Sequence, residues 1–255
     1  MNLLSNAGRD LRRTIRRHID LAADEGPAFD IQTYETLRGM RAWAPGDLVF
    51  DVGANDGRTV LRLMRHLPSP RIFAFEPASA PFAMLTRRTS HLPGVSRYQL
   101  ALGEGEAERT LYINELSALN SLRPDWHGGD KQETVRMTSL DQVMARENPG
   151  PVRLLKIDAE GHDLEVLKGA AATLSKGMVD IIEVEAGFSA PGPSQPSLED
   201  FRRFLEPYGY YLYAIHNQCR GRRLPPCADG SPAPQVLVYC DALFVSARAS
   251  DPGLA

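Results

Sequence analysis

Short apolar runs alternate along the chain with longer stretches in which apolar residues recur every three or four positions. Runs of four to eight apolar residues predict buried strands, and the longer period predicts helices that cover them. The strands predicted for the main sheet span residues 48–52, 71–75, 95–102, 154–158, 179–185, 209–215 and 236–246. The predicted helices span residues 57–66, 80–90, 139–147, 162–174 and 198–207, and a small hairpin is expected near 109–113 and 134–137.

This order of elements predicts an α/β fold. Apolar strands separated by helices indicate a parallel sheet with helices on both faces, and two long consecutive strands at the end add an antiparallel hairpin. We therefore expect a doubly wound, mostly parallel seven-stranded sheet of Rossmann-like type, within one domain over residues 46–248. Residues 1–45 are expected to form a helical extension in front of this domain.

The extension begins with an amphipathic pattern. Leu11, Ile15 and Ile19 recur at helical spacing, and arginines at positions 9, 12, 13, 16 and 17 fill the opposite face. We interpret it as a helix that packs against the domain or, in a homodimer, against a second subunit. Docking to a membrane surface and attraction of an anionic substrate are the alternatives.

Composition narrows the range of partners and compartments. The 255 residues carry a net charge of −3, which gives no global reason to expect a nucleic-acid partner. No run of about 18 apolar residues is present, so we expect no stable membrane insertion. The three cysteines, Cys219, Cys227 and Cys240, show no CxxC spacing and fit reduced thiols in a cytoplasmic protein.

Acidic residues follow or end four of the five predicted parallel strands. They are Asp51 and Asp56 in the segment DVGANDG (51–57), Glu76, Asp158, Glu160, Glu183 and Glu185. In a doubly wound sheet, ligands bind at the carboxyl ends of the strands. These side chains are therefore expected to share one rim and to form a binding site there.

The turn after the first strand indicates which ligand this rim binds. It keeps Gly53 and Gly57 but lacks the GxGxxG pattern of pyrophosphate sites, and carboxylates beside a pyrophosphate would repel it. A ligand with a positive charge and hydroxyls but no phosphate is favoured, and S-adenosylmethionine has this chemistry. Glu76 is placed to accept hydrogen bonds from both ribose hydroxyls, although an acid there would serve NAD equally well.

Several segments, in this order and spacing, resemble the FkbM family. They are DVGANDG (51–57), FEP (75–77), the pair Ala101-Leu102, NSL (120–122), TSLD (138–141) and LLKIDAEGHDLEVLKGA (154–170). The resemblance covers residues 46–186 and departs at Asp163, where the family usually carries glutamate. It implies a class I O-methyltransferase that uses S-adenosylmethionine and methylates a hydroxyl of a small molecule such as a sugar, glycoside, polyketide or other secondary metabolite. The residues expected to bind the cofactor are Asp51, Gly53, Asn55, Asp56, Gly57, Glu76, Pro77, Ala101, Leu102, Ser121 and Asp158.

The fourth strand and the turn after it carry the candidates for catalysis. Methyl transfer requires groups that position the acceptor oxygen and take its proton. The candidates are Asp158, Lys156, His162 and Glu160. Lys156 and Asp158 point to the same face of an extended strand, so a buried ion pair is the alternative reading of Lys156. Glu160 could instead stabilise the N-terminus of the next helix.

Other assignments stay open from the sequence alone. Asp158, Glu160 and Glu185 would supply oxygen ligands of the kind that Mg²⁺ takes if they converge, and His216 could join them. An NAD-linked oxidoreductase and a non-catalytic nucleoside-binding module are the competing functions. A nucleic-acid methyltransferase is disfavoured because DAEG (158–161) stands where an aromatic proline motif would be expected. The loops 186–196 and 216–235 are expected to shape the acceptor pocket.

Overall fold

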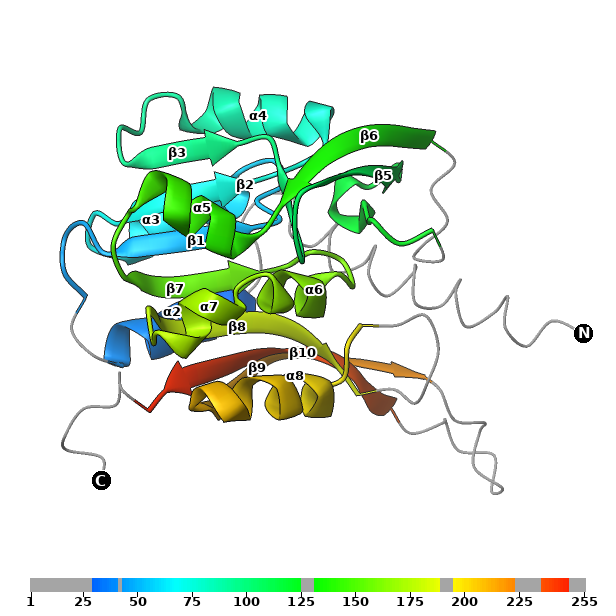
Figure 1. Cartoon of the computed structure of the whole chain (residues 1–255). Helices are drawn as coiled ribbons and strands as arrows, with labels where there is room; N and C mark the ends of the chain where they lie inside the picture. The colour runs from blue at the N-terminus through cyan, green and yellow to red at the C-terminus, as the bar shows by residue number, and fades with distance from the viewer. Residues whose placement is uncertain (1–28, 41–42, 125–130, 189–194, 223–234, 248–255) are drawn as a thin grey trace, which may run out of the picture.

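The computed structural model describes residues 29–40, 43–124, 131–188, 195–222 and 235–247, and Figure 1 shows their arrangement. The main sheet has seven strands in the order β3-β2-β1-β7-β8-β10-β9. These strands are β1 (Leu48–Val52), β2 (Arg71–Phe75), β3 (Val95–Tyr98), β7 (Val152–Ile157), β8 (Val179–Gly187), β9 (Tyr210–Arg222) and β10 (Gln235–Ser246). The first five strands in this order, β3, β2, β1, β7 and β8, are parallel to one another. Strand β10 runs antiparallel to both β8 and β9. The predicted fold class is confirmed.

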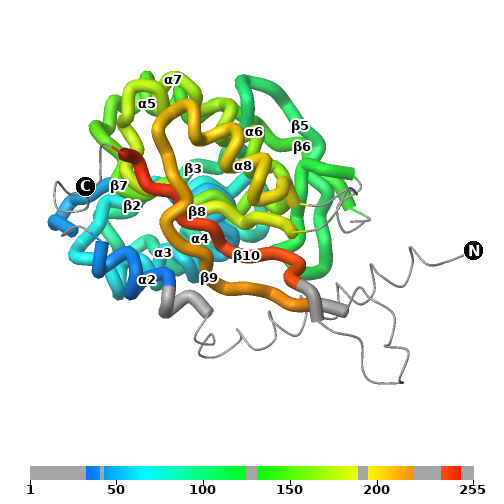
Figure 2. The backbone as a smooth tube through the Cα atoms, turned by 90° about the horizontal axis from the view of Figure 1, so that it is seen from below, coloured from blue at the N-terminus to red at the C-terminus, as the bar shows by residue number. Residues whose placement is uncertain are grey.

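Helices cover both faces of the sheet because neighbouring residues of each central strand point to opposite sides. Val49 and Leu154 pack with α2 (Phe29–Gly39), α3 (Arg58–His66) and α4 (Ser79–Thr89). Phe50 and Leu155 pack with α5 (Leu140–Glu147), α6 (Asp163–Lys168), α7 (Ala171–Ser175) and α8 (Leu198–Leu205). Figure 2 shows α2 and α3 on one side of the sheet and α5 to α8 on the other.

The predicted third strand (95–102) is divided between two sheets. β3 ends at Tyr98, and Ala101-Leu102 form β4 (Ala101–Leu102) in a second sheet of order β4-β6-β5. This small sheet contains the predicted hairpin, now β5 (Ala107–Ile113) and β6 (Lys131–Thr138). The division occurs because β6 pairs with Ala101 and Leu102, and the Gly103 N–H donates to the Thr138 carbonyl over 2.9 Å.

The predicted helix 162–174 is two helices, α6 and α7, with Gly169 between them. A Cβ at Gly169 would lie 1.9 Å from the carbonyl oxygen of Gly103, so the chain packs against this glycine too closely for any side chain. Ser139 and Ser197 form capping boxes with Gln142 and Asp200 at the starts of α5 and α8.

The C-terminal hairpin is longer than predicted. β9 continues past residue 215 to Arg222, with three register irregularities in its pairing with β10. Most of the two expected pocket loops and the amphipathic pattern around Leu11 lie outside the described residues. The part of the extension that is described, α2, packs into the core through Tyr34 and Leu37. None of the helices in the described ranges is long and apolar enough to cross a membrane.

Candidate active site

A cavity of about 580 Å³ opens at the carboxyl ends of β1, β2 and β7. We call it the main cavity. Most residues that the sequence predicted for the cofactor line it, namely Gly53, Asn55, Asp56, Glu76, Pro77, Ala101, Leu102, Ser121 and Asp158. Asp51 and Gly57 were also predicted but are absent from its lining. Three of the four predicted catalytic residues, Asp158, Glu160 and His162, lie on the same wall.

The turn after β1 is held open by glycine and asparagine in the left-handed region. Gly53 has φ +84°, and a Cβ there would lie 1.9 Å from the Asp158 carbonyl oxygen, so β1 and the end of β7 touch at this point. Asn55 has φ 45°, a conformation that asparagine adopts more readily than most residues. This geometry directs the Asn55 N–H to the carboxylate of Glu76.

Glu76 is fixed at the end of β2 by two backbone donors. The Asn55 N–H donates to one of its oxygens over 2.9 Å, and the Ala78 N–H donates to the other over 2.8 Å. Burial raises the pKa of this carboxyl to about 7, although the two hydrogen bonds act in the opposite direction. Each carboxylate oxygen accepts more than one hydrogen bond, so Glu76 keeps acceptor capacity for a ligand in the main cavity.

Asp56 is neutralised by arginines from the neighbouring helices. Arg58 lies 3.3 Å from its carboxylate, and Arg88 forms a second ion pair with the same oxygen. Arg88 also donates to the Asp56 carbonyl over 2.8 Å. The carboxylate of Asp56, which we expected to favour a cationic ligand, is therefore already paired with Arg58 and Arg88.

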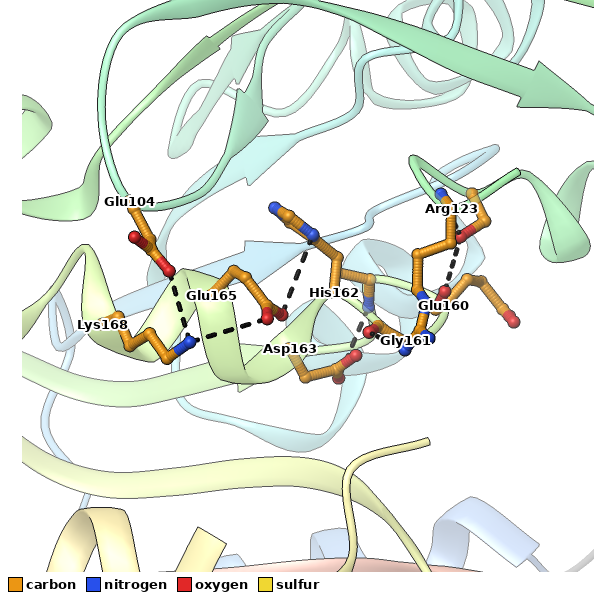
Figure 3. Close-up of polar contacts among 10 residues, drawn as sticks. Glu104, Arg123, Glu160, Gly161, His162, Asp163, Glu165 and Lys168 are labelled. Atoms are coloured by element: carbon orange, nitrogen blue, oxygen red, sulfur yellow. Dashed lines mark hydrogen bonds and ion pairs between the residues drawn. The ribbon is translucent and has the colours of Figure 1, made fainter. Parts of the chain in front are cut away.

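The wall opposite Glu76 is the turn from β7 to α6. Glu160 and Gly161 both have positive φ, 48° and 86°, and glutamate rarely adopts this backbone conformation. Ser121 donates to the Glu160 carbonyl over 2.7 Å, and Arg123 reaches the Gly161 carbonyl (Figure 3). The NSL segment thus ties the small sheet to this turn.

His162 stands between the main cavity and a surface ion network. Its Nδ1 lies 3.8 Å from Glu165, which also contacts Lys168, as Figure 3 shows. Its buried Nε2 has no hydrogen-bond partner among the described residues. Burial lowers the pKa of this imidazole, so His162 is neutral near pH 7. A neutral imidazole is able to accept a proton.

Lys156 does not reach the main cavity. Its Nζ pairs with Asp158 Oδ2 at 3.2 Å, which is the ion pair that the strand geometry anticipated. Burial alone would lower the pKa of Lys156, but the carboxylates of Asp158, Glu183 and other acids outweigh it and hold the pKa well above its usual value. Asp51, fully buried on β1, also interacts electrostatically with Lys156. Burial raises the pKa of Asp51 to about 6.

Lys156 instead lines a second cavity of about 160 Å³, which we call the α2 cavity. Its walls come from α2, α3, the end of β7 and the middle of β8 and β10, and include Thr33, Tyr34, Arg62, Lys156, Glu183 and Asp241. Glu185 also lines it, whereas His216 lines neither of the two cavities.

The predicted alternative of a Mg²⁺ site is not supported. Within the part of the chain that the structure describes, no three His, Cys, Asp or Glu side chains are arranged to hold a metal ion. Asp158, Glu160, Glu185 and His216 all lie in that part. Asp158 and Glu160 line the main cavity, Glu185 faces the α2 cavity, and the four do not form a ligand set.

Sequence reasoning missed the contribution of the last two strands. Asn217 on β9 and Tyr239 and Asp241 on β10 line the main cavity, and the Asn217 amide donates to the Asp241 carboxylate. Asn217 has φ 49° and is the third residue other than glycine on the cavity wall with a left-handed backbone, besides Asn55 and Glu160. An acid within an otherwise apolar strand, Asp241 in LVYCDALFV, was the available signal.

The sequence is similar to those of known methyltransferases. The family model described as the methyltransferase FkbM domain matches residues 51–212. The hexuronic acid methyltransferase AglP of Haloferax volcanii is 30% identical over 145 residues, covering 55% of this chain and 57% of AglP. The 31-O-demethyl-FK506 methyltransferase FkbM of Streptomyces tacrolimicus is 29% identical over 155 residues, covering 49% of this chain and 60% of that protein.

The chain therefore spans less than two thirds of the length of both relatives. Among solved structures, the magnesium protoporphyrin IX methyltransferase of Synechocystis with bound SAM aligns with a TM-score of 0.48 and 10% identity, over 94% of this chain and 83% of that one. The family match covers more than half of the chain and includes the turn after β1, Glu76 and the β7–α6 turn. This chain belongs to the FkbM family of methyltransferases.

Proposed function

We propose that the chain transfers a methyl group from S-adenosylmethionine to a hydroxyl of a small molecule. The names of two relatives support this class of acceptor, since one acts on a hexuronic acid and the other on an O-demethylated FK506. When bound, S-adenosylmethionine supplies an electrophilic methyl group on a sulfonium. The protein then has two tasks, which are to hold the adenosine and to prepare the acceptor oxygen.

The observation that carries the proposal is the fixed carboxylate of Glu76 in the main cavity. Two backbone N–H groups orient it, and its remaining lone pairs suit a ribose diol. Asp158 and Glu160 also line the main cavity, and carboxylates beside Glu76 oppose a pyrophosphate, while Asp56 is paired with Arg58 and Arg88. The donor set therefore favours S-adenosylmethionine over NAD, which also carries a ribose diol.

The acceptor side of the cavity is the wall formed by Asp158, His162 and Asp241. The Nζ of Lys156 lies 3.2 Å from Asp158 Oδ2 and holds this carboxylate in place on the wall. We assign Asp158 the role of general base for the acceptor hydroxyl. His162, neutral and with a buried Nε2, is the second group able to take a proton on this wall.

Titration calorimetry with S-adenosylhomocysteine and with NAD tests the cofactor assignment. We expect binding of S-adenosylhomocysteine alone. Glu76→Ala should weaken it at least about tenfold, since charge-assisted hydrogen bonds contribute roughly 1.5–3 kcal/mol each. Glu115→Ala, at an exposed residue that lines the same cavity, is the matched control and should bind normally. Preferential binding of NAD, or an unchanged dissociation constant for folded Glu76→Ala, would refute the assignment.

A further inference from the structure

The α2 cavity has a wall that the family match does not include. Thr33 and Tyr34 belong to α2, which precedes residue 51, where that match begins. α2 packs against α3 and β9 on the face of the sheet seen at the lower side of Figure 2. The cavity is therefore completed by the N-terminal part of this chain, outside the matched methyltransferase region.

The two cavities adjoin each other. Thr59, Arg62, Asp158 and Asp241 line both of them. Asp158 is the proposed base, so the α2 cavity begins at the residue that would contact the reacting hydroxyl. At about 30 Å³ for each water molecule, its volume of about 160 Å³ equals that of about five waters. That is room for a small polar part of an acceptor.

The wall from α2 presents an unsatisfied hydroxyl. Thr33 is only 2% exposed, and its Oγ1 has no hydrogen-bond partner among the described residues. Buried hydroxyls are normally paired, so such an atom on a cavity wall indicates a group that is to be bound there. Tyr34 lies next to it, with its ring stacked on His66 at 4.9 Å between centroids, and this stacking fixes the ring in place.

The charges around the α2 cavity nearly balance. Lys156 and Arg62 lie beside four acids, Asp158, Glu183, Glu185 and Asp241. Burial raises the pKa of Glu183 to about 8 and that of Glu185 well above its usual value, so both are largely protonated at neutral pH and are able to donate as well as accept a hydrogen bond. A lining of hydroxyls, acids and a lysine with little net charge suits an uncharged ligand that both donates and accepts hydrogen bonds.

We propose that the α2 cavity is an acceptor subsite that binds an uncharged, polyhydroxylated group adjacent to the hydroxyl that is methylated, with Thr33 and Tyr34 as its specificity residues. The inference rests on the proposed function, because the subsite is defined by its contact with Asp158. It assigns the N-terminal helix a direct part in choosing the acceptor.

Ligand-observed NMR with three sugars of the same ring tests the subsite. The probes are D-glucose, which is neutral, D-glucuronate, which is anionic, and D-glucosamine, which is cationic, each titrated onto the full chain with and without saturating S-adenosylhomocysteine. We expect saturable binding that is tightest for glucose. Thr33→Val and Tyr34→Phe each remove one hydroxyl without changing shape, and each should weaken glucose binding about fivefold. Their affinity for S-adenosylhomocysteine should be unchanged.

Thr36→Val is the matched control, because Thr36 lies on the same helix but lines neither cavity. It should bind glucose as the wild type does.

Thr33→Val should melt at the same or a higher temperature than the wild type, since the lost hydroxyl has no protein partner. A marked decrease in melting temperature would contradict that premise. Absence of saturable glucose binding, equal affinity in all variants, or tighter binding of either charged sugar would overturn the subsite. Failure of S-adenosylhomocysteine to bind would instead refute the proposed function.

Discussion

At the scale of single residues, the proposed reaction assigns the role of general base to the carboxylate of Asp158. Its side chain is 45% exposed, lines both cavities and is held by the more buried Lys156. Asp158→Asn keeps the shape and removes the base, so we expect kcat to fall about 10²–10⁴-fold. The affinity for S-adenosylhomocysteine should change little, because Glu76 lies on another strand. The rate of methyl transfer to an acceptor that the wild-type enzyme methylates is the measurement.

Two controls accompany this variant. EDTA should leave the wild-type rate unchanged, since the described acids and histidines form no metal site. His162→Gln tests the second proton acceptor on the same wall. Near-native turnover by Asp158→Asn together with a large loss in His162→Gln would move the role of base to the histidine.

Some residues of the main cavity could be predicted from the order of strands along the chain, and others could not. Glu76, Asp158 and Glu160 follow parallel strands, so their position on one rim could be predicted from the alternation of elements alone. Asn217 and Asp241 lie within antiparallel strands, where the rim is reached in the middle of the strand. Which residue meets the cavity then depends on register and bulges between β9 and β10, and these have no signature in a single sequence.

At the scale of elements, the chain makes two close approaches that periodicity could not reveal. The pattern from 162 to 174 is continuous and helical, yet Gly169 is packed on the Gly103 carbonyl and the helix divides there. The run from 95 to 102 is continuously strand-like, yet its last two residues pair with β6. The first difference comes from the contact of Gly169 with the small sheet and the second from pairing within that sheet, and both contacts are tertiary and outweigh local preference.

Gly169→Ala tests whether this contact stabilises the fold. Gly169 has φ −70°, so alanine meets no backbone strain there, but its Cβ would lie 1.9 Å from the Gly103 oxygen. We expect the free energy of unfolding to decrease by about 1–3 kcal/mol, as is usual for overpacking. Gly105→Ala is the control, since a Cβ there has no neighbour within 4 Å. Equal denaturant midpoints for the two variants would show that the contact is not required.

At the scale of the whole molecule, the topology of the sheet determines which rim binds the ligand, independently of the side chains. β1 lies between β2 and β7 at the centre of the sheet, and the chain crosses from one half of the sheet to the other at this point. The order of strands and helices was sufficient to predict this, because few arrangements of alternating elements are compatible with right-handed crossovers. The α2 cavity could not be predicted in the same way, since it depends on how residues before the domain pack on β9 and α3.

The concentration of buried acids on this rim has a consequence for the stability of the whole protein. Burial raises the pKa of Asp51 and Asp241 to about 6, of Glu76 and Asp163 to about 7, and of Glu183 to about 8. Between the ordinary carboxyl pKa and these values, the folded protein keeps protons that the unfolded chain has released. The free energy of unfolding must therefore decrease as pH rises from 5.5 to 8, on the order of 1.4 kcal/mol per pH unit for each group that still holds its proton.

Other titrating groups limit the pH range over which the free energy of unfolding decreases, but they do not reverse this decrease. Burial lowers the pKa of His162 and His216, which adds stability with rising pH only up to about 6.5, and Lys156 stays protonated in both states throughout. Urea unfolding at pH 5.5, 6.5, 7.25 and 8 measures the trend. Glu183→Gln mimics the protonated carboxyl, so this variant should match the wild type at pH 5.5 and exceed its stability at pH 8. A wild-type stability that stays constant or rises from pH 6.5 to 8 would mean that these carboxylates are ionised in the folded protein, with Lys156 and Arg62 compensating their burial.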